Sequence, residues 1–295
     1  MEEKKPRVKI LVACHKADPN IRQDDIYMPI QVGAALHPEL DLGFQKDNEG
    51  DNISEKNGSY CELTALYWAW KNLRDVDYIG LAHYRRYFDF ATKGITNRII
   101  PAKEIPQLAD LELKGCLKAN EVILPTFFST NISLFESFNV NMYPEDLYIL
   151  YKVFDKHCKG YLKTFEKYML GNKRTAYNMF VMSKDNFDKY CEWLFKILGL
   201  VESKVKPSQY ILYRRIFGYM GELLLPIFCL NEGLNIKEKR VIFAGGQDDK
   251  QSSEVKIRIR ELLYKISFNL SSKISRKSLY DPFYEMYLKM DGIEI

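Results

Sequence analysis

Two adjacent arginines, Arg85 and Arg86, follow a histidine at the point where a short apolar run ends. The run Tyr78–Ala82 turns abruptly into the polar sequence His83-Tyr-Arg-Arg-Tyr87. Such a run is typical of a buried strand that delivers polar side chains to the rim of a sheet. In open α/β sheets this rim, at the carboxyl ends of the strands, is where ligands bind. Because guanidinium groups bind phosphate and carboxylate oxygens bidentately, the pattern predicts a site for an anionic ligand.

Polar residues also stand at the ends of other predicted elements. His15 follows the β-branched run Arg7–Cys14, which predicts a first buried strand. A second arginine pair, Arg214 and Arg215, precedes a glycine and Glu222 at the start of a predicted helix. A carboxylate in this position could face a cleft, or it could only neutralise the positive end of the helix.

The segment before the first arginine pair contains polar residues with two interpretations each. Asp51 and Asn52 lie in the turn-rich loop Gly50–Ser54, where they could hold a ligand or serve the turn alone. Ser59 and Glu62 match the S-x-x-E capping box, and an apolar helical pattern follows them. Glu62 could therefore cap this helix or contact a ligand.

Asp75 and Asp77 form a D-x-D pair, a pattern that can hold a divalent cation against a diphosphate. The pair precedes its strand, whereas a metal-binding pair at the ligand rim should follow its strand. We therefore expect these carboxylates to serve a turn at the opposite edge of the sheet. The sequence contains neither G-x-G-x-x-G nor G-x-x-x-x-G-K-[ST], so it predicts neither a dinucleotide fingerprint nor a P-loop.

Runs with strand and helix periodicity alternate along the chain, which predicts an α/β fold. Apolar runs predict further strands at Glu121–Pro125 and at Ala176–Met182, and Asn178 is embedded in the second of these. Helical patterns occur near Ile105–Leu113, from Pro144 onward and at Phe187–Leu198.

Composition and charge restrict the class of protein. The chain has 295 residues, with 46% apolar and 28% charged residues, which suits one large globular domain or two small ones. A net charge of +4 without a broad basic stripe predicts no nucleic-acid partner. No stretch reaches the ~20 apolar residues of a transmembrane helix. The N-terminus lacks the apolar region of a signal peptide.

Six widely spaced cysteines contain no C-x-x-C pair. This spacing argues against a zinc site, and the chain is long for a disulfide framework, so we expect reduced thiols as in a cytoplasm. The cysteines are Cys14, Cys61, Cys116, Cys158, Cys191 and Cys229.

The C-terminal part is basic and amphipathic. Residues 251–280 contain seven Lys or Arg against two Glu, and five apolar residues share a helical face. We therefore divide the chain into a domain over residues 1–245 and a basic helical segment over residues 246–295. This segment could lie on an anionic membrane surface, or it could pack on the domain with its basic face in solvent. The five apolar residues are Ile259, Leu262, Leu263, Ile266 and Leu270.

Several blocks of residues, spread over residues 7–230, together carry a family likeness. The most specific block is Gly80-Leu-Ala-His-Tyr-Arg-Arg-Tyr-Phe88. The others are Asp51-Asn-Ile-Ser54, Asn57, Tyr60, Glu62-Leu-Thr-Ala-Leu-Tyr-Trp68, Trp70-Lys-Asn72, Tyr177-Asn-Met-Phe180, Tyr190-Cys-Glu-Trp-Leu-Phe195, Arg215, Gly218 and Glu222-Leu-Leu224. These blocks resemble a bacterial family catalogued as domain of unknown function 4422. Its members occur in capsular and exopolysaccharide clusters as glycosyltransferases, some described as galactofuranosyltransferases.

The resemblance implies a GT-A-like fold, which is a mixed, mostly parallel sheet flanked by helices, followed here by a helical C-terminal region. In this order of elements His83–Arg86 stands where a metal-binding D-x-D is expected. The departure implies that arginines neutralise a leaving diphosphate without a metal, with Mn²⁺ or Mg²⁺ as the alternative. The implied general base is Glu222, with Asp51 as the alternative.

The implied reaction is the transfer, by inversion, of galactofuranose or galactose from a UDP-sugar to a lipid-linked glycan in capsule, exopolysaccharide or O-antigen synthesis. The protein would be cytoplasmic and could associate peripherally with the inner membrane face. The competing hypothesis is a non-catalytic nucleotide- or carbohydrate-binding module derived from a transferase. The substrate-binding residues implied by the resemblance are His15, Asn52, Asn57, Glu62, Thr64, Tyr67, His83, Arg85, Arg86, Asn178 and Arg215.

Overall fold

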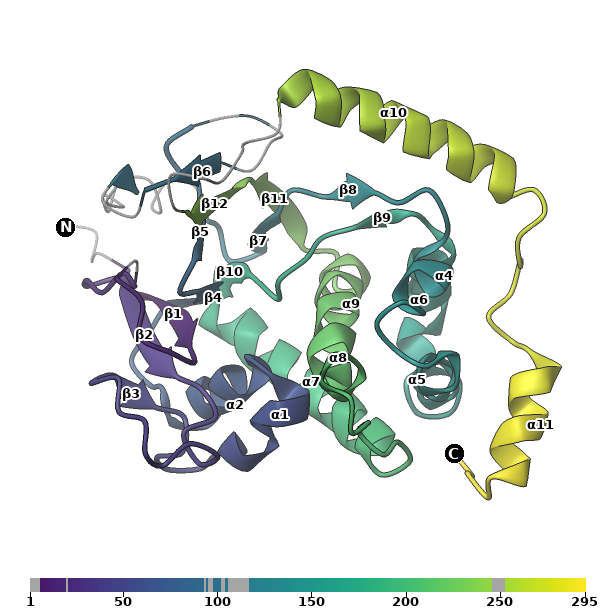
Figure 1. Cartoon of the computed structure of the whole chain (residues 1–295), viewed down its shortest axis with the longest axis horizontal. Helices are drawn as coiled ribbons and strands as arrows, with labels where there is room; N and C mark the ends of the chain where they lie inside the picture. The colour runs from purple at the N-terminus through teal and green to yellow at the C-terminus, as the bar shows by residue number, and fades with distance from the viewer. Residues whose placement is uncertain are drawn as a thin grey trace.

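The computed structural model describes residues 6–19, 21–92, 94, 98–101, 104–105, 117–245 and 253–295. A mixed sheet forms its centre, with helices on one face (Figure 1). The strands of this sheet are β1 (Val8–Cys14), β2 (Tyr27–Gln31), β3 (Gln45–Lys46), β4 (Tyr78–His83), β5 (Arg86–Phe88), β6 (Arg98–Ile100), β7 (Glu121–Pro125), β10 (Phe180–Ser183), β11 (Asn235–Lys239) and β12 (Val241–Ala244). A separate two-stranded sheet consists of β8 (Phe128–Ser129) and β9 (Lys173–Arg174).

The helices alternate with these strands along the chain, as the sequence predicts for an α/β fold. They are the 3-10 helix η1 (Ser54–Lys56), α1 (Asn57–Tyr60), α2 (Leu63–Asn72), α4 (Leu134–Phe138), α5 (Pro144–His157), α6 (Lys159–Leu170), α7 (Lys184–Glu202), α8 (Ile211–Arg214), α9 (Ile216–Asn231), α10 (Glu254–Ser271) and α11 (Pro282–Met290).

The main path of the sheet runs in the order β11-β7-β10-β4-β1-β2-β3. β1 is parallel to both β2 and β4, and β7 is parallel to β11, whereas β10 is antiparallel to β4 and β7. The predicted mixed, mostly parallel sheet is thereby confirmed. Because β1 and β4 are parallel, with Ala13 opposite His83, their carboxyl ends meet at one edge of the sheet.

Residues of the central strands alternate between two hydrophobic cores, because successive side chains point to opposite faces. In β1, Leu11 and Ala13 belong to the larger core, which the helices α2, α5, α6, α7 and α9 complete. Ile10, Val12 and Cys14 belong to the smaller core on the other face, together with residues of β5 and β12. A strand buried on both faces explains why residues 10–14 form a continuous apolar run.

The predicted capping box at Ser59 and Glu62 is wrong. The helical pattern breaks at Cys61, whose φ of 53° lies in the left-handed region. Ser59 lies within α1 and donates its hydroxyl to the Lys56 carbonyl at 3.2 Å. Glu62 stands at the N-cap position of α2 but makes no side-chain capping hydrogen bond. Its carboxylate is therefore available for another contact.

Two further elements begin at other residues than predicted. The strand expected from Ala176 begins only at Phe180, because Tyr177 and Asn178 have φ values of 77° and 50° that no strand residue adopts. Glu222 lies in the second turn of α9, since that helix begins at Ile216. Its carboxylate therefore cannot serve as a first-turn partner of the helix dipole.

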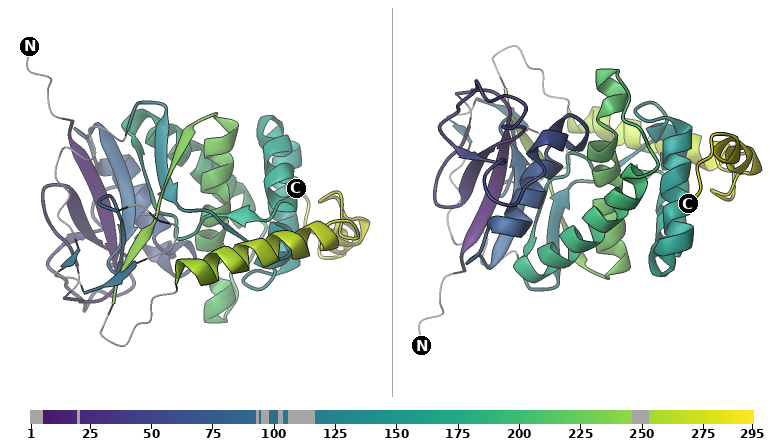
Figure 2. Two further views of the ribbon diagram at one scale, coloured as in Figure 1. Left: turned by 90° about the horizontal axis from the view of Figure 1, so that it is seen from above. Right: turned by 90° about the horizontal axis from the view of Figure 1, so that it is seen from below.

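The C-terminal region is helical, as predicted. α10 lies along the outside of the molecule and buries none of its residues (Figure 1, Figure 2). Glu261 attaches it to the small sheet by accepting hydrogen bonds from the Ser129 backbone N–H at 3.1 and 3.0 Å. Leu279 and Leu288, in contrast, belong to the larger hydrophobic core, so the end of the chain packs against the helices of that core.

Within the part of the chain that the structure describes, no helix is long and apolar enough to cross a membrane. The five cysteines found in this part are free thiols. Cys116 and nearly all of the helix predicted near Ile105–Leu113 lie outside the described residues.

Candidate functional site

A cavity of about 700 Å³ opens at the edge where β1 and β4 end. Its walls come from the loop after β1, the β4–β5 hairpin, the α1–α2 junction, the segment before β10, and the α8–α9 region. Eight predicted site residues line it: His15, Asn57, Glu62, His83, Arg85, Arg86, Arg215 and Glu222. The structure therefore brings eight of the predicted site residues together in one cavity, and their functional roles stay predictions.

The β4–β5 hairpin carries both arginines of the first pair to the cavity. His83 pairs with Arg86 across the hairpin, so Tyr84 and Arg85 form its turn. Adjacent side chains point to opposite faces only within a strand. Because the turn ends this alternation, the adjacent Arg85 and Arg86 can line the same cavity. Arg85 donates from Nε to the Ala244 carbonyl at 3.4 Å.

Arg86 is held by aromatic rings rather than by a carboxylate. Its guanidinium carbon lies 4.6 Å from the centre of the Tyr177 ring and 5.8 Å from that of Phe243. Its buried Nε has no hydrogen-bond partner among the described residues. Stacking on rings orients the guanidinium and leaves donors for a ligand in the cavity.

Burial favours the neutral form of His83. Its Nε2 lies 2.6 Å from the Tyr177 carbonyl oxygen, which can only accept, so Nε2 carries the hydrogen. Burial lowers the pKa of His83, although Glu62 and the Tyr177 carbonyl oppose this effect. A neutral ring with Nε2–H leaves Nδ1 unprotonated. The neutral form of His83 adds no positive charge to the cavity lining.

Glu222 is paired with a residue that sequence reasoning missed. Arg174, at the end of β9, donates to the Glu222 carboxylate at 2.6 Å. Burial raises the pKa of Glu222 to about 7; Arg174 acts in the opposite direction, and nearby Glu62 adds to the rise. A carboxyl group with a pKa near neutrality can exchange a proton at physiological pH.

Glu62 is held by Asn178, which connects the α1–α2 junction to α9. Asn178 donates from Nδ2 to the Glu62 carboxylate at 2.7 Å and to the Gly218 carbonyl at 3.0 Å. A Cβ atom at Gly221 would lie 2.8 Å from the Asn178 Oδ1, so only glycine leaves room for this contact. Asn178 itself is 2% exposed and positions Glu62 from behind the cavity wall.

Three non-glycine residues around the cavity have left-handed backbones: Cys61, Tyr177 and Asn178, with φ of 53°, 77° and 50°. Such conformations are uncommon outside glycine and cluster at functional sites. Here they bring the Glu62 carboxylate to Asn178 and the Tyr177 carbonyl to His83. No sequence pattern indicated them.

The cavity carries an excess of positive charge. Arg85, Arg86, Arg214 and Arg215 line it together with the carboxylates Glu62 and Glu222. None of these arginines forms an ion pair with a carboxylate in the described residues. Arg86 is half-buried, and a charge removed from water is normally paired, so the arrangement fits an anionic ligand. Arg214 was not among the predicted site residues, although its place beside Arg215 was a usable signal.

Five predicted site residues lie outside the cavity lining: Asp51, Asn52, Thr64, Tyr67 and Asn178. Asn52 serves its own turn, since its side chain bonds Asn48, Gly50 and Ser54. The exposed Asp51 accepts from the Tyr67 hydroxyl at 3.3 Å, away from Glu222. This placement does not support Asp51 as the alternative base.

Thr64 lies behind the cavity wall and hydrogen-bonds Asp47, a residue that sequence reasoning missed. The fully buried Asp47 accepts from the hydroxyls of Thr64 and Ser54 at 2.6 and 2.5 Å. It also accepts from the backbone N–H groups of Gly33 and Ala34 at 2.8 and 3.0 Å. Thr64 in turn accepts a hydrogen bond from the cavity residue Asn57 at 3.0 Å. Asp47 thus fixes the loop after β2 against the α1–α2 wall.

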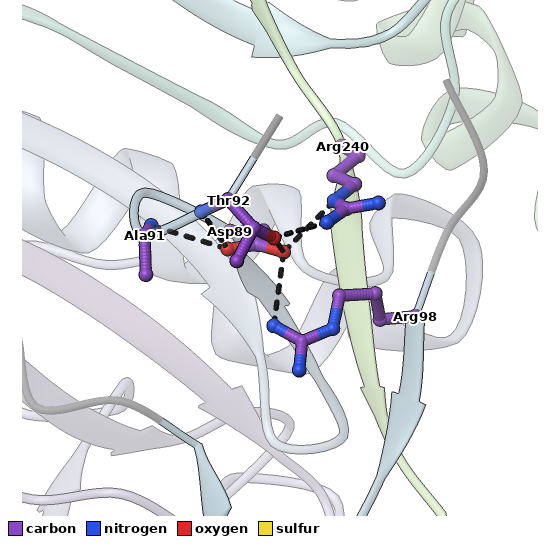
Figure 3. Close-up of polar contacts among 5 residues, drawn as sticks. All are labelled: Asp89, Ala91, Thr92, Arg98 and Arg240. Atoms are coloured by element: carbon purple, nitrogen blue, oxygen red, sulfur yellow. Dashed lines mark hydrogen bonds and ion pairs between the residues drawn. The ribbon is translucent and has the colours of Figure 1, made fainter. Parts of the chain in front are cut away.

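A second buried carboxylate, Asp89, fixes the wall formed by β5, β6 and β12 (Figure 3). Arg240 and Arg98 donate to one of its oxygens at 2.9 and 3.3 Å. The backbone N–H groups of Ala91 and Thr92 donate to the other at 3.1 and 3.0 Å. Because β12 carries Phe243 and Ala244 into the cavity lining, this cluster sets the position of that wall.

The D-x-D pair lies where the sequence predicted. Asp75 and Asp77 form ion pairs with Arg7 at 3.3 and 3.4 Å, at the start of β4 rather than at its carboxyl end. Over the described ranges, no three His, Cys, Asp or Glu side chains group together in a way that could hold a metal ion. The carboxylates of the cavity are instead bonded to Arg174 and Asn178.

The family follows from comparison with known proteins. A family model described as Domain of unknown function (DUF4422) matches residues 9–233. The chain belongs to this family. Among solved structures, the DUF4422 chain is similar to apo WbbM, a bifunctional glycosyltransferase, with 29% identity and a TM-score of 0.74. The match covers 81% of this chain and 45% of WbbM, so the DUF4422 chain spans about half the length of that protein. No curated protein matches it.

Proposed function

We propose that this DUF4422 protein is a glycosyltransferase that uses a UDP-sugar. The observation that carries the proposal is one cavity that combines four arginines without carboxylate partners and a buried glutamate whose pKa is raised to about 7. Glycosyl transfer from a nucleotide sugar needs both parts. Cations must stabilise the leaving diphosphate, and for direct inversion a base must take the proton of the acceptor hydroxyl. The similarity to WbbM, which is a glycosyltransferase, supports the proposal.

Arg85 and Arg86 are assigned to the diphosphate. They come from the hairpin that follows β4, at the strand rim where ligands of α/β sheets bind. Their guanidinium groups stay charged at every physiological pH and bind phosphate oxygens bidentately. His83 does not share this role, because its pKa is lowered by burial and the ring is neutral. We propose that the arginines replace a metal ion at this position.

Glu222 is assigned as the general base for an inverting transfer. Arg174 holds its carboxylate in one orientation by the 2.6 Å hydrogen bond, and Glu222 lines the cavity that the acceptor hydroxyl would enter. In the transfer step the hydroxyl oxygen bonds to the anomeric carbon as the bond to the diphosphate breaks. The hydroxyl proton passes to Glu222, and UDP leaves with the electron pair.

The donor sugar is proposed from family resemblance alone as galactofuranose or galactose, and the acceptor as a lipid-linked glycan. The test is to incubate the full chain with UDP-galactofuranose, UDP-galactopyranose, UDP-glucose and GDP-mannose and to measure nucleotide release. Release of UDP with one sugar, including slow hydrolysis without an acceptor, is expected. Binding of UDP-sugars with no release under any condition would instead identify a non-catalytic nucleotide-binding module.

We further propose that α10 lies on an anionic membrane surface at the cytoplasmic face. Its apolar residues Ile259, Leu262, Leu263 and Ile266 are each about half exposed, at 53%, 58%, 58% and 49%. Basic residues flank this stripe, and anionic lipid attracts juxtaposed Lys and Arg. Cosedimentation with phosphatidylglycerol vesicles tests the proposal. The variant Ile259→Asp/Leu263→Asp should stay in solution, and equal sedimentation of variant and wild type would exclude α10 as the contact.

A further inference from the structure

The cavity carries a second arginine pair that comes from the α8–α9 region rather than from the sheet. Arg214 donates to the backbone carbonyls of Ser208 and Gln209, at 3.2 and 2.5 Å. Arg215 donates from Nε to the Cys61 sulfur at 3.3 Å. Neither arginine pairs with a carboxylate in the described parts of the chain. Neutral acceptors hold both groups in place, so their charge is available to an anion.

Exposed apolar side chains stand next to these arginines. Tyr210, Ile211 and Leu212 are 63%, 77% and 46% exposed, and Ile211 also lines the cavity. Tyr143, which is 41% exposed, stacks on the Tyr213 ring at 4.7 Å. We call Tyr143, Tyr210, Ile211 and Leu212 the α8 patch. Contiguous apolar residues exposed at the edge of a cavity mark a contact surface.

We propose that Arg214 and Arg215 together with the α8 patch form an acceptor subsite. It binds the phosphate that joins the glycan to its lipid, and the first part of the hydrocarbon chain lies on the patch. This proposal rests on the proposed function and names how the same cavity recognises its second substrate. The first arginine pair binds the donor diphosphate, so two anionic groups enter one cavity from different walls.

The chemistry of the surface favours a lipid phosphate over a protein partner. A specific protein interface buries at least about 1,000 Å² and places its arginines among other polar contacts at a rim. Here the apolar surface consists of four side chains directly beside two arginines that face a cavity. A single anionic group followed by a hydrocarbon chain matches this combination in size and in charge.

Direct binding of octyl phosphate to the full chain tests the subsite, with inorganic phosphate and octanol as partial ligands. Isothermal titration calorimetry should show that octyl phosphate binds at least about tenfold more tightly than inorganic phosphate. Arg214→Gln should weaken octyl phosphate about tenfold. Arg74→Gln is the matched control, because Arg74 is also exposed and also donates to a backbone carbonyl, that of Lys71 at 3.0 Å.

A second pair of variants isolates the apolar contribution. Leu212→Asp should weaken octyl phosphate about tenfold, because it places a charge where the chain lies. Leu230→Asp adds the same charge to a leucine of similar exposure, 48%, at the far end of α9, and should leave binding unchanged. Equal affinities for octyl phosphate and inorganic phosphate in the wild type would overturn the subsite. Equal losses of octyl phosphate affinity in Arg214→Gln and Arg74→Gln, or in Leu212→Asp and Leu230→Asp, would also overturn it.

The outcomes separate this subsite from the proposed function, since UDP release without an acceptor does not involve a lipid phosphate. UDP release without any preference for octyl phosphate would overturn the subsite and retain the transferase. Selective octyl phosphate binding without nucleotide release would support the lipid-phosphate site and overturn the transferase.

Discussion

The Glu222 carboxylate accepts a hydrogen bond from Arg174 at 2.6 Å, and yet its pKa is raised to about 7. Burial is the largest cause, because a charged carboxylate loses its hydration in the cavity. Arg174 lowers the pKa of Glu222 but offsets only part of the effect of burial, and the nearby Glu62 carboxylate raises this pKa further. The pair thus produces a carboxylate that is fixed in orientation and close to half ionised at neutral pH.

Replacing this carboxylate should remove the base. Glu222→Gln keeps the shape of the side chain, and we expect kcat to fall about 10²- to 10⁴-fold with little change in the affinity for UDP. Because the base acts when ionised, wild-type kcat/KM should rise with pH through about 7. Steady-state rates between pH 5 and pH 9 measure both effects. The control is Glu39→Gln, because the Glu39 side chain is 73% exposed. Near-normal kcat in Glu222→Gln would refute the assignment of Glu222 as the general base.

Arg174 should set the position of that pH profile. The guanidinium lowers the pKa of Glu222, so its loss in Arg174→Met should raise this pKa further. The acidic limb of the kcat/KM profile should then move to higher pH. The rate should fall less at high pH than at neutral pH, because the base is ionised at high pH in both proteins. A lower rate with an unshifted limb would mean that Arg174 only supports the fold. Arg174→Lys should restore part of the shift, because it retains the charge.

Transfer should survive removal of divalent cations. The Asp75–Asp77 pair is bonded to Arg7 at the far edge, and the described cavity residues do not form a metal cluster. UDP release assayed in excess EDTA should therefore equal release in Mg²⁺ or Mn²⁺ within about twofold. Complete loss of activity that added Mn²⁺ or Mg²⁺ reverses would contradict the role given to Arg85 and Arg86.

The Asp89 cluster should contribute to stability. Asp89 is fully buried between Arg98 and Arg240, and removing one partner of a buried ion pair costs about 3–5 kcal/mol. Asp89→Asn should therefore lower the free energy of unfolding by about 3 kcal/mol in urea titrations. Asp75→Asn removes an exposed carboxylate and should cost less than about 1 kcal/mol.

The same cluster predicts a pH dependence of stability. Burial alone would raise the pKa of Asp89, but hydrogen bonds from Thr92, Arg98 and Arg240 lower it below its usual value. A depressed pKa in the folded state adds stability above the unfolded pKa of about 3.9, and this stability is lost as pH falls through the folded value. Wild type should lose more stability than Asp89→Asn on acidification below pH 4. Parallel losses would show that Asp89 is not paired in solution.

Periodicity and strand-end polarity predicted the strands β1, β4 and β7 and the shared rim where β1 and β4 end. The continuous apolar run of β1 and the switch to polarity after Ala82 are local signals, and parallel pairing brings their ends together at His15 and His83. Arg85 and Glu222, which the sequence offered as candidates, both line the cavity.

The remaining parts of the site depend on backbone conformations and distant pairings that a single sequence does not encode locally. The break at Cys61 and the left-handed pair Tyr177–Asn178 turned two predicted regular elements into cavity walls. Arg174 reaches Glu222 across 48 residues, so no motif links them. Asp51 lies outside the cavity lining, because its carboxylate accepts from the Tyr67 hydroxyl and its loop turns away from the cavity.

The central claim is that the first arginine pair binds the diphosphate of a sugar nucleotide whose sugar is then transferred. Its most direct test is UDP release from UDP-sugars by wild type, Arg85→Gln/Arg86→Gln and the surface variant Arg74→Gln. Wild type and Arg74→Gln should release UDP at the same rate, and the double variant should fall at least about 10²-fold, because two charge-assisted contacts to phosphate are lost. Equal rates in all three proteins, or no release by wild type with any sugar nucleotide, would contradict it.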